Sequence, residues 1–384
     1  MSTRFPFIQQ LRQMAESGVL AQLLTRRNHP FGFSDSRAEY INSRTRLLAM
    51  LFAVLTPLWI PVDYFILEAE QFQLMAMVRL IFSVLLVLLS RASAERVTFA
   101  RAQRRLIALM VLPALFHLVT VQILSGGEYG GLMVFYTFLP FLIVVMHSIF
   151  PLTLAEGTVL SLLTISLLSL DELFSGSLLS FEGIAYLWLM CLLMGVAIWA
   201  QLSQLHMQLN LFNQATTDPL TGLLNRRALI KQLDLVEQQM LRNPRPVSLL
   251  LIDLDRFKSI NDTHGHLAGD KVLKCFSKTL QAEVRTTDYV ARFGGEEFLV
   301  VLPETRPEEA MLLAKRVGDS CRDAVIELDA EQRVTFTVSI GIGQLSTNST
   351  VETAISHTDL ALYQAKKQGR DCAVFSSDVV AVVG

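Results

Sequence analysis

The apolar residues of this chain are concentrated in its first half, and this limits what the chain can fold into. Of its 384 residues, 52% are hydrophobic and the mean hydropathy is +0.42, which is too apolar for an ordinary soluble protein. The excess lies before residue 205, in six stretches close to the ~20 residues that a helix needs to cross a bilayer. They are Leu47–Leu67, Leu74–Leu89, Leu106–Leu124, Leu132–Phe150, Thr153–Leu170 and Ile184–Leu202, the second and fifth being short. The sequence therefore predicts an α-helical membrane domain of six spans over residues 44–203.

The basic residues predict which side of the membrane each connecting segment faces. Segment 1–43 and the loop after the second span are rich in arginine, whereas loops 68–71, 125–131 and 171–183 contain acidic residues and no Lys or Arg. By the positive-inside rule the N-terminus is cytoplasmic, and six spans return the chain to the same side. The charges in segment 1–43 also argue against a cleavable signal peptide.

Four of the polar residues inside the predicted spans bear on a possible sensing function. Asp63 and Arg79 lie at similar depth on either side of the first outer turn, so we expect them to pair or face a cavity, or else to extend to the interface. His117 and His147 are separated by about 12 Å along the spans, which is too far to share one ion. These residues do not reveal which signal the domain senses. A transporter is disfavoured because the two halves of the domain show no repeat.

The helix of the sixth span is expected to continue as a stalk over residues 204–217. Apolar residues recur there at helical spacing, at Leu202, Leu205, Leu209 and Phe212. Two heptads fit either a coiled coil between two chains or a helix that packs on its own domain. Pro219 predicts the end of the helix, because it disfavours helical geometry at Asp218.

Residues 218–376 have the pattern of a cytoplasmic α/β domain, followed by a tail over 377–384. Strands are predicted at 247–254, on both sides of Gly294 and along 334–343, and helices at 225–241, 268–284, 307–325 and 351–368. The four cysteines are widely spaced without a CxxC pair, which indicates reduced thiols. The net charge of −2 gives no argument for binding nucleic acid.

The segment ARFGGEEFLVVLP, residues 291–303, places two carboxylates directly after two glycines. Gly294 and Gly295 would let the backbone adopt positive φ and approach a ligand. Glu296 and Glu297 must be solvated or bound to cations, because unpaired burial costs several kcal/mol. If this hairpin pairs beside strand 247–254, Glu296 meets Asp253 at one edge. Two carboxylates and a backbone carbonyl are suitable ligands for Mg²⁺.

Five motifs, in order, resemble those of the GGDEF-domain diguanylate cyclases, with GGEEF as a variant. They are DPLTGLLNRR, IDLDRFKSINDTHGHLAGD, RTTD, RFGGEEF and TDLALYQAKKQGRD, within residues 215–376. Thr358 and Asp371 replace the more usual Ala and Asn. The resemblance implies a palm-like fold with a mainly antiparallel sheet flanked by helices, in a protein of the bacterial inner membrane. It implies condensation of two GTP into cyclic di-GMP and two pyrophosphates, by a homodimer because each domain would hold one GTP.

The resemblance also implies roles for individual residues. Each active site would hold two Mg²⁺ ions, with Mn²⁺ as an alternative. Their ligands would be Asp253, Glu296 and the carbonyl of Leu254, and Glu297 would assist these ligands. Asn261 and Asp270 would bind the guanine. Phosphates would be bound by Lys258, Gly294, Gly295, Lys366 and Arg370. Lys366 and Arg370 are expected one turn apart on one helical face, where they would otherwise form a solvated helix end.

Two interpretations remain open beside these roles. Arg285 and Asp288 of RTTD match the product-binding inhibitory motif of the family, but an isolated RxxD is usually a turn with an Asp cap. The domain as a whole could be a catalytically silent receptor for cyclic di-GMP, although its metal and guanine positions all match those of active enzymes. His264 and His266 are expected to be structural. The glycines of VSIGIG (338–343) are expected to allow close packing of a core strand.

Overall fold

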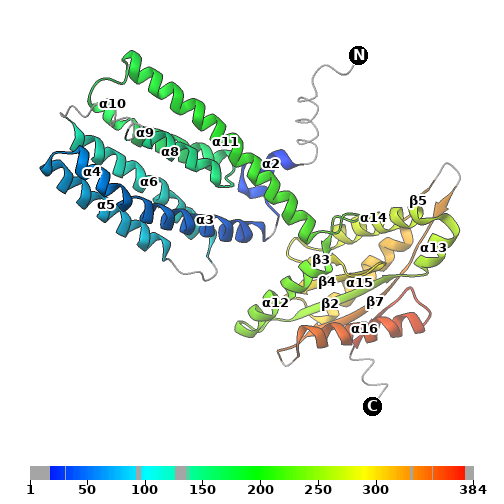
Figure 1. Cartoon of the computed structure of the whole chain (residues 1–384). Helices are drawn as coiled ribbons and strands as arrows, with labels where there is room; N and C mark the ends of the chain where they lie inside the picture. Colours follow the sequence, from blue (N-terminus) through cyan, green and yellow to red (C-terminus); the bar gives the residue numbers. More distant parts are fainter. Residues whose placement is uncertain are drawn as a thin grey trace, which may run out of the picture. The chain divides into compact units, whose positions relative to one another are not determined.

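The computed structural model describes residues 18–30, 32–91, 97–125, 136, 138–328, 332–347 and 349–376. The chain divides into two compact units, Met1–Leu211 and Phe212–Gly384 (Figure 1). Residues 1–17 of the predicted N-terminal segment 1–43 lie outside the described residues, as does the whole predicted tail 377–384.

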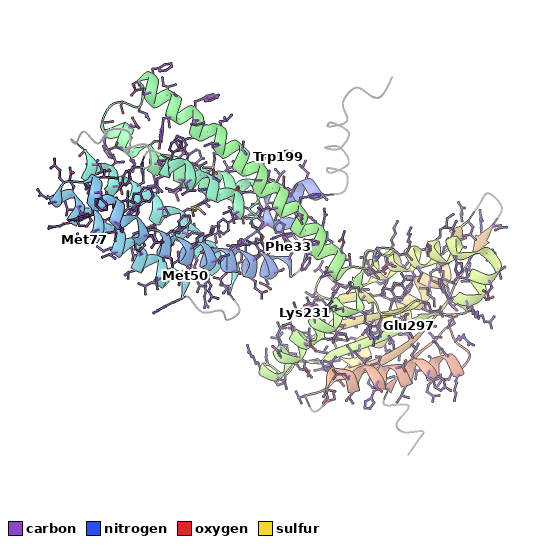
Figure 2. All side chains as sticks on the ribbon, viewed as in Figure 1. Phe33, Met50, Met77, Trp199, Lys231 and Glu297 are labelled. Atoms are coloured by element: carbon purple, nitrogen blue, oxygen red, sulfur yellow. The ribbon has the colours of Figure 1, made fainter. Side chains whose placement is uncertain are left out.

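The first unit is helical throughout its described residues. Its elements are α2 (Val19–Leu24), η1 (Arg26–Asn28), α3 (Phe33–Leu55), η2 (Pro57–Trp59), α4 (Ile60–Ile66), α5 (Ala69–Ser90), α6 (Phe99–Leu124), α8 (Leu139–Met146), η4 (His147–Ile149), α9 (Leu154–Leu168), α10 (Leu170–Phe174) and most of α11 (Phe181–Thr216). Large apolar side chains such as Met50, Met77 and Trp199 are exposed on α3, α5 and α11 (Figure 2). Exposure of this kind fits helices that are surrounded by an apolar medium.

Four segments of the described chain are long and apolar enough to cross a membrane: Phe33–Ile66, Ala69–Ser90, Phe99–Leu124 and Phe181–Thr216. The prediction of six spans is therefore not confirmed. The second predicted span, thought to be short, is a helix of 22 residues. The fourth, part of which lies outside the described residues, and the fifth correspond to the shorter apolar helices Leu139–Ile149 and Leu154–Leu168. The break between them is local, because Thr153 and Glu156 form a capping box that starts α9 at Leu154.

The predicted stalk is the C-terminal part of α11, which ends at Thr216, as Pro219 indicated. Leu205 and Leu209 are only 0% and 2% exposed in the single chain, whereas Met207 and Leu211 are exposed. Leu205 and Leu209 are therefore not free to form a seam with a second chain. Of the two interpretations of the stalk, the structure favours a helix whose leucines pack within their own chain.

The second unit is built on a six-stranded mixed sheet with the order β1-β3-β4-β2-β7-β8. Its strands are β1 (Leu224–Asn225), β2 (Val247–Leu254), β3 (Tyr289–Arg292), β4 (Glu297–Pro303), β7 (Val338–Leu345) and β8 (Ala373–Phe375). The central pairs β3–β4, β4–β2 and β2–β7 are antiparallel, whereas the outer pairs β1–β3 and β7–β8 are parallel. A separate ribbon pairs β5 (Ile326–Glu327) with β6 (Arg333–Val334).

Helices cover both faces of the sheet. They are α12 (Arg226–Arg242), α13 (Phe257–His264), α14 (His266–Glu283), α15 (Pro307–Asp323) and α16 (Val351–Lys367). Side chains of a strand alternate between faces, so Leu250 and Ile252 of β2 pack with α14 and α15, whereas Leu249 and Leu251 pack with α12 and α16. Asp253 has the same parity as Leu251 and therefore leaves β2 on the α16 side.

Two details of strand β7 qualify the sequence prediction. The run 334–343 is interrupted between Val334 and Val338, although its alternate apolar residues share one core as expected. The expected role of the glycines is confirmed, because a Cβ on Gly341 would lie within 3.0 Å of backbone atoms of Thr358 and Leu362. Helix α16 can therefore pack directly on β7. The short elements β1, β5, β8 and α13 were not predicted.

Candidate active site

The end of β2 and the GGEE turn lie side by side. In the antiparallel register of β2 and β4, Asp253 is opposite Glu297, and the amide of Leu254 donates to the carbonyl of Glu296 at 3.3 Å. The predicted pairing of the hairpin beside β2 is thus confirmed, and it brings Asp253 and Glu296 to one edge of the sheet. Glu297 is the first residue of β4 (Figure 2).

The electrostatics of this edge favour a bound cation. Burial raises the pKa of Asp253, and the neighbouring charge of Asp255 adds to the effect. Burial also raises the pKa of Glu296, followed by the charges of Asp253 and Glu297. Lys366 opposes these shifts, because its Nζ lies 2.8 Å from Oδ2 of Asp253. One lysine thus balances several crowded carboxylates, which a divalent cation would stabilise further.

The donors at this edge fit Mg²⁺ better than a soft metal. They are carboxylate oxygens and backbone carbonyls, which are the ligands that hard cations prefer. Among the described residues, no three His, Cys, Asp or Glu side chains are grouped closely enough to hold a metal ion by themselves. His264 and His266 are both exposed. A cation at Asp253 and Glu296 would need further oxygen ligands from the backbone and from a phosphate.

The two glycines of the turn act differently from the sequence prediction. Neither Gly294 nor Gly295 has a positive φ, so that expectation is wrong. A Cβ on Gly294 would lie 2.5 Å from Oε2 of Glu297, so the Glu297 side chain would have to shift to make room for it. At Gly295 no atom lies within 4 Å of an added Cβ, so the backbone is open to a ligand on that side.

Arg292 and Asp218 fix the turn, and sequence reasoning missed both. Nε and Nη2 of Arg292 donate to the carbonyl of Gly295 at 3.1 and 2.7 Å, and Nη1 lies 3.2 Å from both carboxylate oxygens of Asp218. Although burial alone would raise the pKa of Asp218, hydrogen bonds from Thr221 and the charge of Arg292 lower it. Both residues belong to the motifs named above, since Asp218 begins DPLTGLLNRR and Arg292 begins RFGGEEF, and this could have marked them as part of the site.

The corner between α13 and α14 brings the Asn261 side chain next to Gly269, the residue before Asp270. Gly265, with φ of 81°, makes the corner, and its amide donates to the carbonyl of Asn261 at 2.8 Å. A Cβ on Gly269 would overlap Oδ1 of Asn261, so the Asn261 side chain lies against the residue before Asp270. Both candidate guanine-binding residues are half-buried, and Lys258 on the first turn of α13 is exposed.

Lys366 and Arg370 do not share a helical face, which corrects the prediction. Helix α16 ends at Lys367, and Gly369 and Arg370 follow with φ of 115° and 70°. Gly369 allows this sharp exit, since only glycine adopts such φ values without strain. Both cations still act on one carboxylate, because Lys366 and then Arg370 lower the pKa of Asp253 against the effect of burial.

Asp255 has a structural position. Its carboxylate accepts hydrogen bonds from the hydroxyls of Thr337 and Ser339 at 2.7 and 2.6 Å and from the amide of Asp371 at 3.0 Å. Asp371, which replaces the family's Asn, also pairs with Nη1 of Arg322 at 2.6 Å. Asp255 therefore ties β7 to the exit of α16.

The RTTD segment forms a turn with an Asp cap. Oδ2 of Asp288 accepts from the amide of Arg285 at 2.8 Å, and the amide of Asp288 donates back to the carbonyl of Arg285 at 3.1 Å. Oδ1 of Asp288 is buried without a hydrogen bond, and burial raises the pKa of this carboxyl group. The Arg285 side chain is exposed. The turn geometry is thus present, with the Arg285 side chain exposed and the Asp288 carboxylate used as the cap of the turn.

In the first unit, the polar residues singled out in the sequence are buried. Asp63 and Arg79 form the expected pair, with Nε of Arg79 2.6 Å from Oδ2 of Asp63. His147 bonds to the carbonyl of Ile143 and the hydroxyl of Thr164, both at 3.1 Å, so its ring is used in packing. His117 is buried as well, with no hydrogen bond to its Nδ1 among the described residues.

The domain is a mixed α/β sheet flanked by helices, with carboxylates at the end of its central strand next to a glycine turn. The family model "Diguanylate cyclase, GGDEF domain" matches residues 215–372. Diguanylate cyclase DgcP of Pseudomonas aeruginosa is 42% identical over 158 residues, covering 41% of this chain and 23% of that protein. Response regulator PleD of Caulobacter vibrioides is 41% identical over 163 residues, covering 42% of this chain and 36% of that protein.

One relative extends beyond the α/β unit. Uncharacterized protein YhcK of Bacillus subtilis is 31% identical over 275 residues, covering 70% of this chain and 76% of that protein. The chain therefore belongs to the GGDEF family, and the α/β unit is its GGDEF diguanylate cyclase domain. The chain spans only about a quarter to a third of the length of DgcP and PleD, which share this domain with it.

Proposed function

We propose that this protein is a membrane-bound diguanylate cyclase that condenses two GTP into cyclic di-GMP and two pyrophosphates. The observation that carries the proposal is the meeting of Asp253 and Glu296 at the edge of β2, with Lys366 at 2.8 Å from Asp253, inside the segment that matches the family. A catalytically silent receptor for cyclic di-GMP is the competing function. The complete set of carboxylates and cations favours the enzyme.

The chain's residues divide the work of the reaction. Two Mg²⁺ ions per site, or Mn²⁺ in their place, would be held by Asp253, Glu296 and the carbonyl of Leu254. When bound, the metal supplies Lewis-acid activation of the attacking hydroxyl and neutralises phosphate charge. Glu297 assists at the same edge. The half-buried pair Asn261 and Asp270 reads the guanine by hydrogen bonds.

The cations of the site bind the triphosphate. These are Lys366, Arg370 and the exposed Lys258, while the open backbone at Gly294 and Gly295 lets a phosphate approach. Lys366 pairs with Asp253, so a cation that binds Asp253 would free the lysine to contact the phosphates. This exchange keeps the site near electroneutrality at each stage.

Assembly and location complete the proposal. A cyclic product with two identical halves needs two facing GTP sites, and one GGDEF domain supplies one, so the active form is a homodimer. The four long apolar helices support a membrane location. We propose residues 44–203 as a six-span sensor domain of the bacterial inner membrane, 204–217 as the connecting helix and 218–376 as the cyclase domain, with both termini cytoplasmic.

The full-length protein in lipid nanodiscs, supplied with GTP and Mg²⁺, tests the enzyme directly. We expect cyclic di-GMP by mass spectrometry, and a loss of at least ~100-fold in rate for Glu296→Gln, since removal of a group that stabilises transition-state charge costs about 3 kcal/mol. The matched control Glu352→Gln, on the exposed first turn of α16, should react like the wild type. Binding of cyclic di-GMP by folded protein without any turnover would establish the silent alternative.

We also propose that the product inhibits the enzyme through RTTD. The exposed Arg285 can bind a phosphate, and the carboxylate of Asp288 is of the type that accepts guanine N–H groups. Because this turn precedes β3 and is separate from Glu296, inhibition should be non-competitive with GTP. Arg285→Ala should relieve inhibition and keep the initial rate. Equal inhibition of both proteins, or competition with GTP, would exclude this site.

A further inference from the structure

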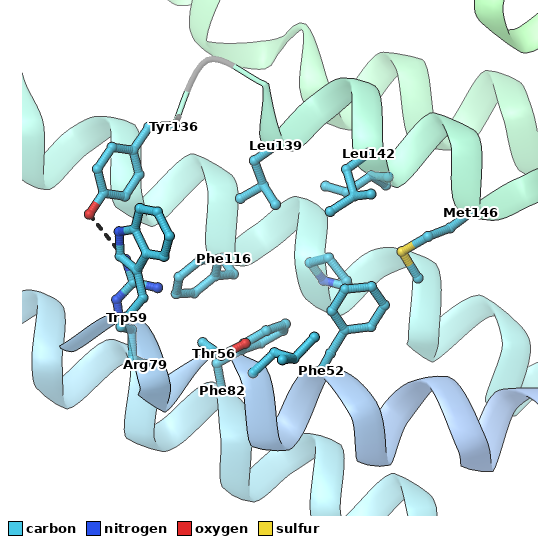
Figure 3. A pocket seen from close by; sticks show the side chains of 13 residues that line it. Phe52, Thr56, Trp59, Arg79, Phe82, Phe116, Tyr136, Leu139, Leu142 and Met146 are labelled. Carbon is cyan, nitrogen blue, oxygen red and sulfur yellow. Dashed lines mark hydrogen bonds between the residues drawn. The ribbon is translucent and has the colours of Figure 1, made fainter. Parts of the chain in front are cut away.

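The helical unit contains a cavity of about 300 Å³ whose walls are unusually aromatic (Figure 3). It lies among α3, η2, α5, α6 and α8, within the first unit. Five aromatic side chains line it: Phe52, Trp59, Phe82, Phe116 and Tyr136. The other lining residues are aliphatic apart from Thr56, Met146 and Arg79. A volume of this size is at the lower end for small-molecule sites.

One end of the cavity is polar, and its polar groups are tightly organised. Arg79 and Asp63 are only 5% and 0% exposed. Besides the contact at 2.6 Å, Nη2 of Arg79 lies 3.2 Å from Oδ1 of Asp63 and 3.0 Å from the hydroxyl of Tyr136. That hydroxyl in turn donates to Asp63. Figure 3 shows Tyr136 reaching Arg79 at this end of the cavity.

The charge balance of this end selects against a charged ligand. Arg79 and Asp63 already neutralise each other, so an added carboxylate or ammonium would be a buried charge without a partner, which costs several kcal/mol. Arg79 donates to Asp63 and Tyr136 through Nε and Nη2, and its Nη1 makes no hydrogen bond to the described residues. A guanidinium N–H group is therefore available to an uncharged acceptor, such as a carbonyl oxygen.

The apolar walls select for a flat molecule. Phe82 and Phe116 are stacked with centroids 4.7 Å apart, and the guanidinium of Arg79 lies 5.7 Å from the Phe116 ring. Pro113 interrupts the hydrogen bonding of α6 beside them, which helps to leave space at this level. Aromatic walls favour aromatic guests, because ring pairs add to the energy of simple burial.

The cavity opens on the outer surface of the helices. Two of its lining residues, Leu55 and Leu142, are about half-exposed on α3 and α8. If these apolar helices lie in a bilayer, a ligand reaches the cavity from the hydrocarbon region and must be soluble there. We propose that the cavity binds an uncharged, membrane-soluble ring compound with a hydrogen-bond-accepting group, which accepts from Arg79 while the ring lies against Phe82 and Phe116. This goes beyond the proposed cyclase, since it assigns a ligand class to the helical half.

Trp59 provides a reporter inside the cavity. The chain has three tryptophans, and the other two, Trp188 and Trp199, are exposed on α11, so Trp188→Phe with Trp199→Phe leaves Trp59 alone. The full chain in nanodiscs is titrated with 2-acetylnaphthalene, 2-ethylnaphthalene and 2-naphthoate, at concentrations corrected for partition into empty nanodiscs. We expect saturable quenching of Trp59, about tenfold tighter for the ketone than for the hydrocarbon, since one hydrogen bond to a charged donor is worth that factor. Naphthoate should bind weakest.

Two variants separate the site from non-specific partition. Leu142→Phe adds bulk to the cavity wall and should weaken binding of the ketone at least fivefold, whereas Val145→Phe, equally exposed on α8 but outside the lining, should not. The double variant Arg79→Met with Asp63→Leu removes every donor of the guanidinium and leaves no unpaired buried charge, so it should abolish the preference for the ketone. Melting temperatures show whether each variant is folded.

The outcomes are decisive in both directions. Equal binding of ketone and hydrocarbon would mean that Arg79 donates no hydrogen bond to the ligand, and tightest binding of naphthoate would mean an anion site. Non-saturating quenching, or equal effects of Leu142→Phe and Val145→Phe, would also overturn the proposal. Because binding is read from Trp59 and not from cyclic di-GMP formation, failure of this site and failure of the cyclase are distinguishable.

Discussion

Arg292 offers the sharpest test of how the active site is held in place. Its guanidinium makes two hydrogen bonds to the carbonyl of Gly295, directly before Glu296, and a third contact to Asp218. Arg292→Ala removes all of these contacts without touching a proposed ligand of Mg²⁺. The turn should then sample positions in which Glu296 no longer points to Asp253.

The size of the effect follows from the number and exposure of these bonds. A hydrogen bond to a charged group contributes about 1.5–3 kcal/mol, and the pair is partly exposed, so the lower end applies. A loss of ~1.5 kcal/mol in the free energy of holding the turn corresponds to about a tenfold change in an equilibrium constant. The Mg²⁺ concentration for half-maximal rate should therefore rise about tenfold, while the KM for GTP at saturating Mg²⁺ changes much less.

The assay is the rate of cyclic di-GMP formation by the full-length protein over a Mg²⁺ titration at fixed GTP. Hydrogen exchange at the amides of residues 293–297 provides an independent measure, since loss of the Arg292 bonds should speed exchange there. Arg242→Ala, in the exposed last turn of α12, is the matched control. If Arg292→Ala needs no more Mg²⁺ than wild type and the turn exchanges at the same rate, Arg292 does not position Glu296.

The remaining predictions concern packing and pH. Gly341→Ala should destabilise the α/β unit by about 3 kcal/mol, because the new Cβ would overlap backbone atoms of α16, whereas Gly295→Ala should unfold at nearly the wild-type temperature. Because the pKa values of Asp253 and Glu296 are raised, these groups take up protons at a higher pH than usual and lose their affinity for cations as the pH falls. The rise in melting temperature on adding Mg²⁺ should thus shrink between neutral and mildly acidic pH; a pH-independent rise would contradict the raised values.

Much of the α/β unit could be predicted because its signals are local. The apolar run 247–254 is β2 to the residue, and the helices differ from prediction by a few residues at their ends. The convergence of Asp253 and Glu296 also followed from sequence, since it needs only one hairpin beside one strand. The short strands β1 and β8 could not be predicted, because two or three residues carry no periodicity and pair only through the tertiary fold.

The helical unit was harder to predict for a different reason. Hydropathy counts apolar residues but does not show where a helix begins or ends. Within the described residues, the predicted spans Leu132–Phe150 and Thr153–Leu170 therefore correspond to the shorter helices Leu139–Ile149 and Leu154–Leu168. The spacing of leucines in the stalk likewise does not show which surface the leucines contact. A stripe of leucines on one face shows that the face is buried, and Leu205 and Leu209 are buried, but in their own chain.

Arg292 shows why parts of the site itself could not be predicted. The sequence places Arg292 two residues before Gly294, where a solvated arginine is a reasonable expectation. Its partner Asp218 is 74 residues away in sequence, and the two meet because β1 pairs in parallel with β3, with Asn225 opposite Arg292. The motifs contain Arg292 and Asp218, but a motif does not show which residues these two side chains contact. The carboxylates of the site can be assigned from their local chemistry, whereas the residues that hold those carboxylates in place become visible only through the register of the sheet.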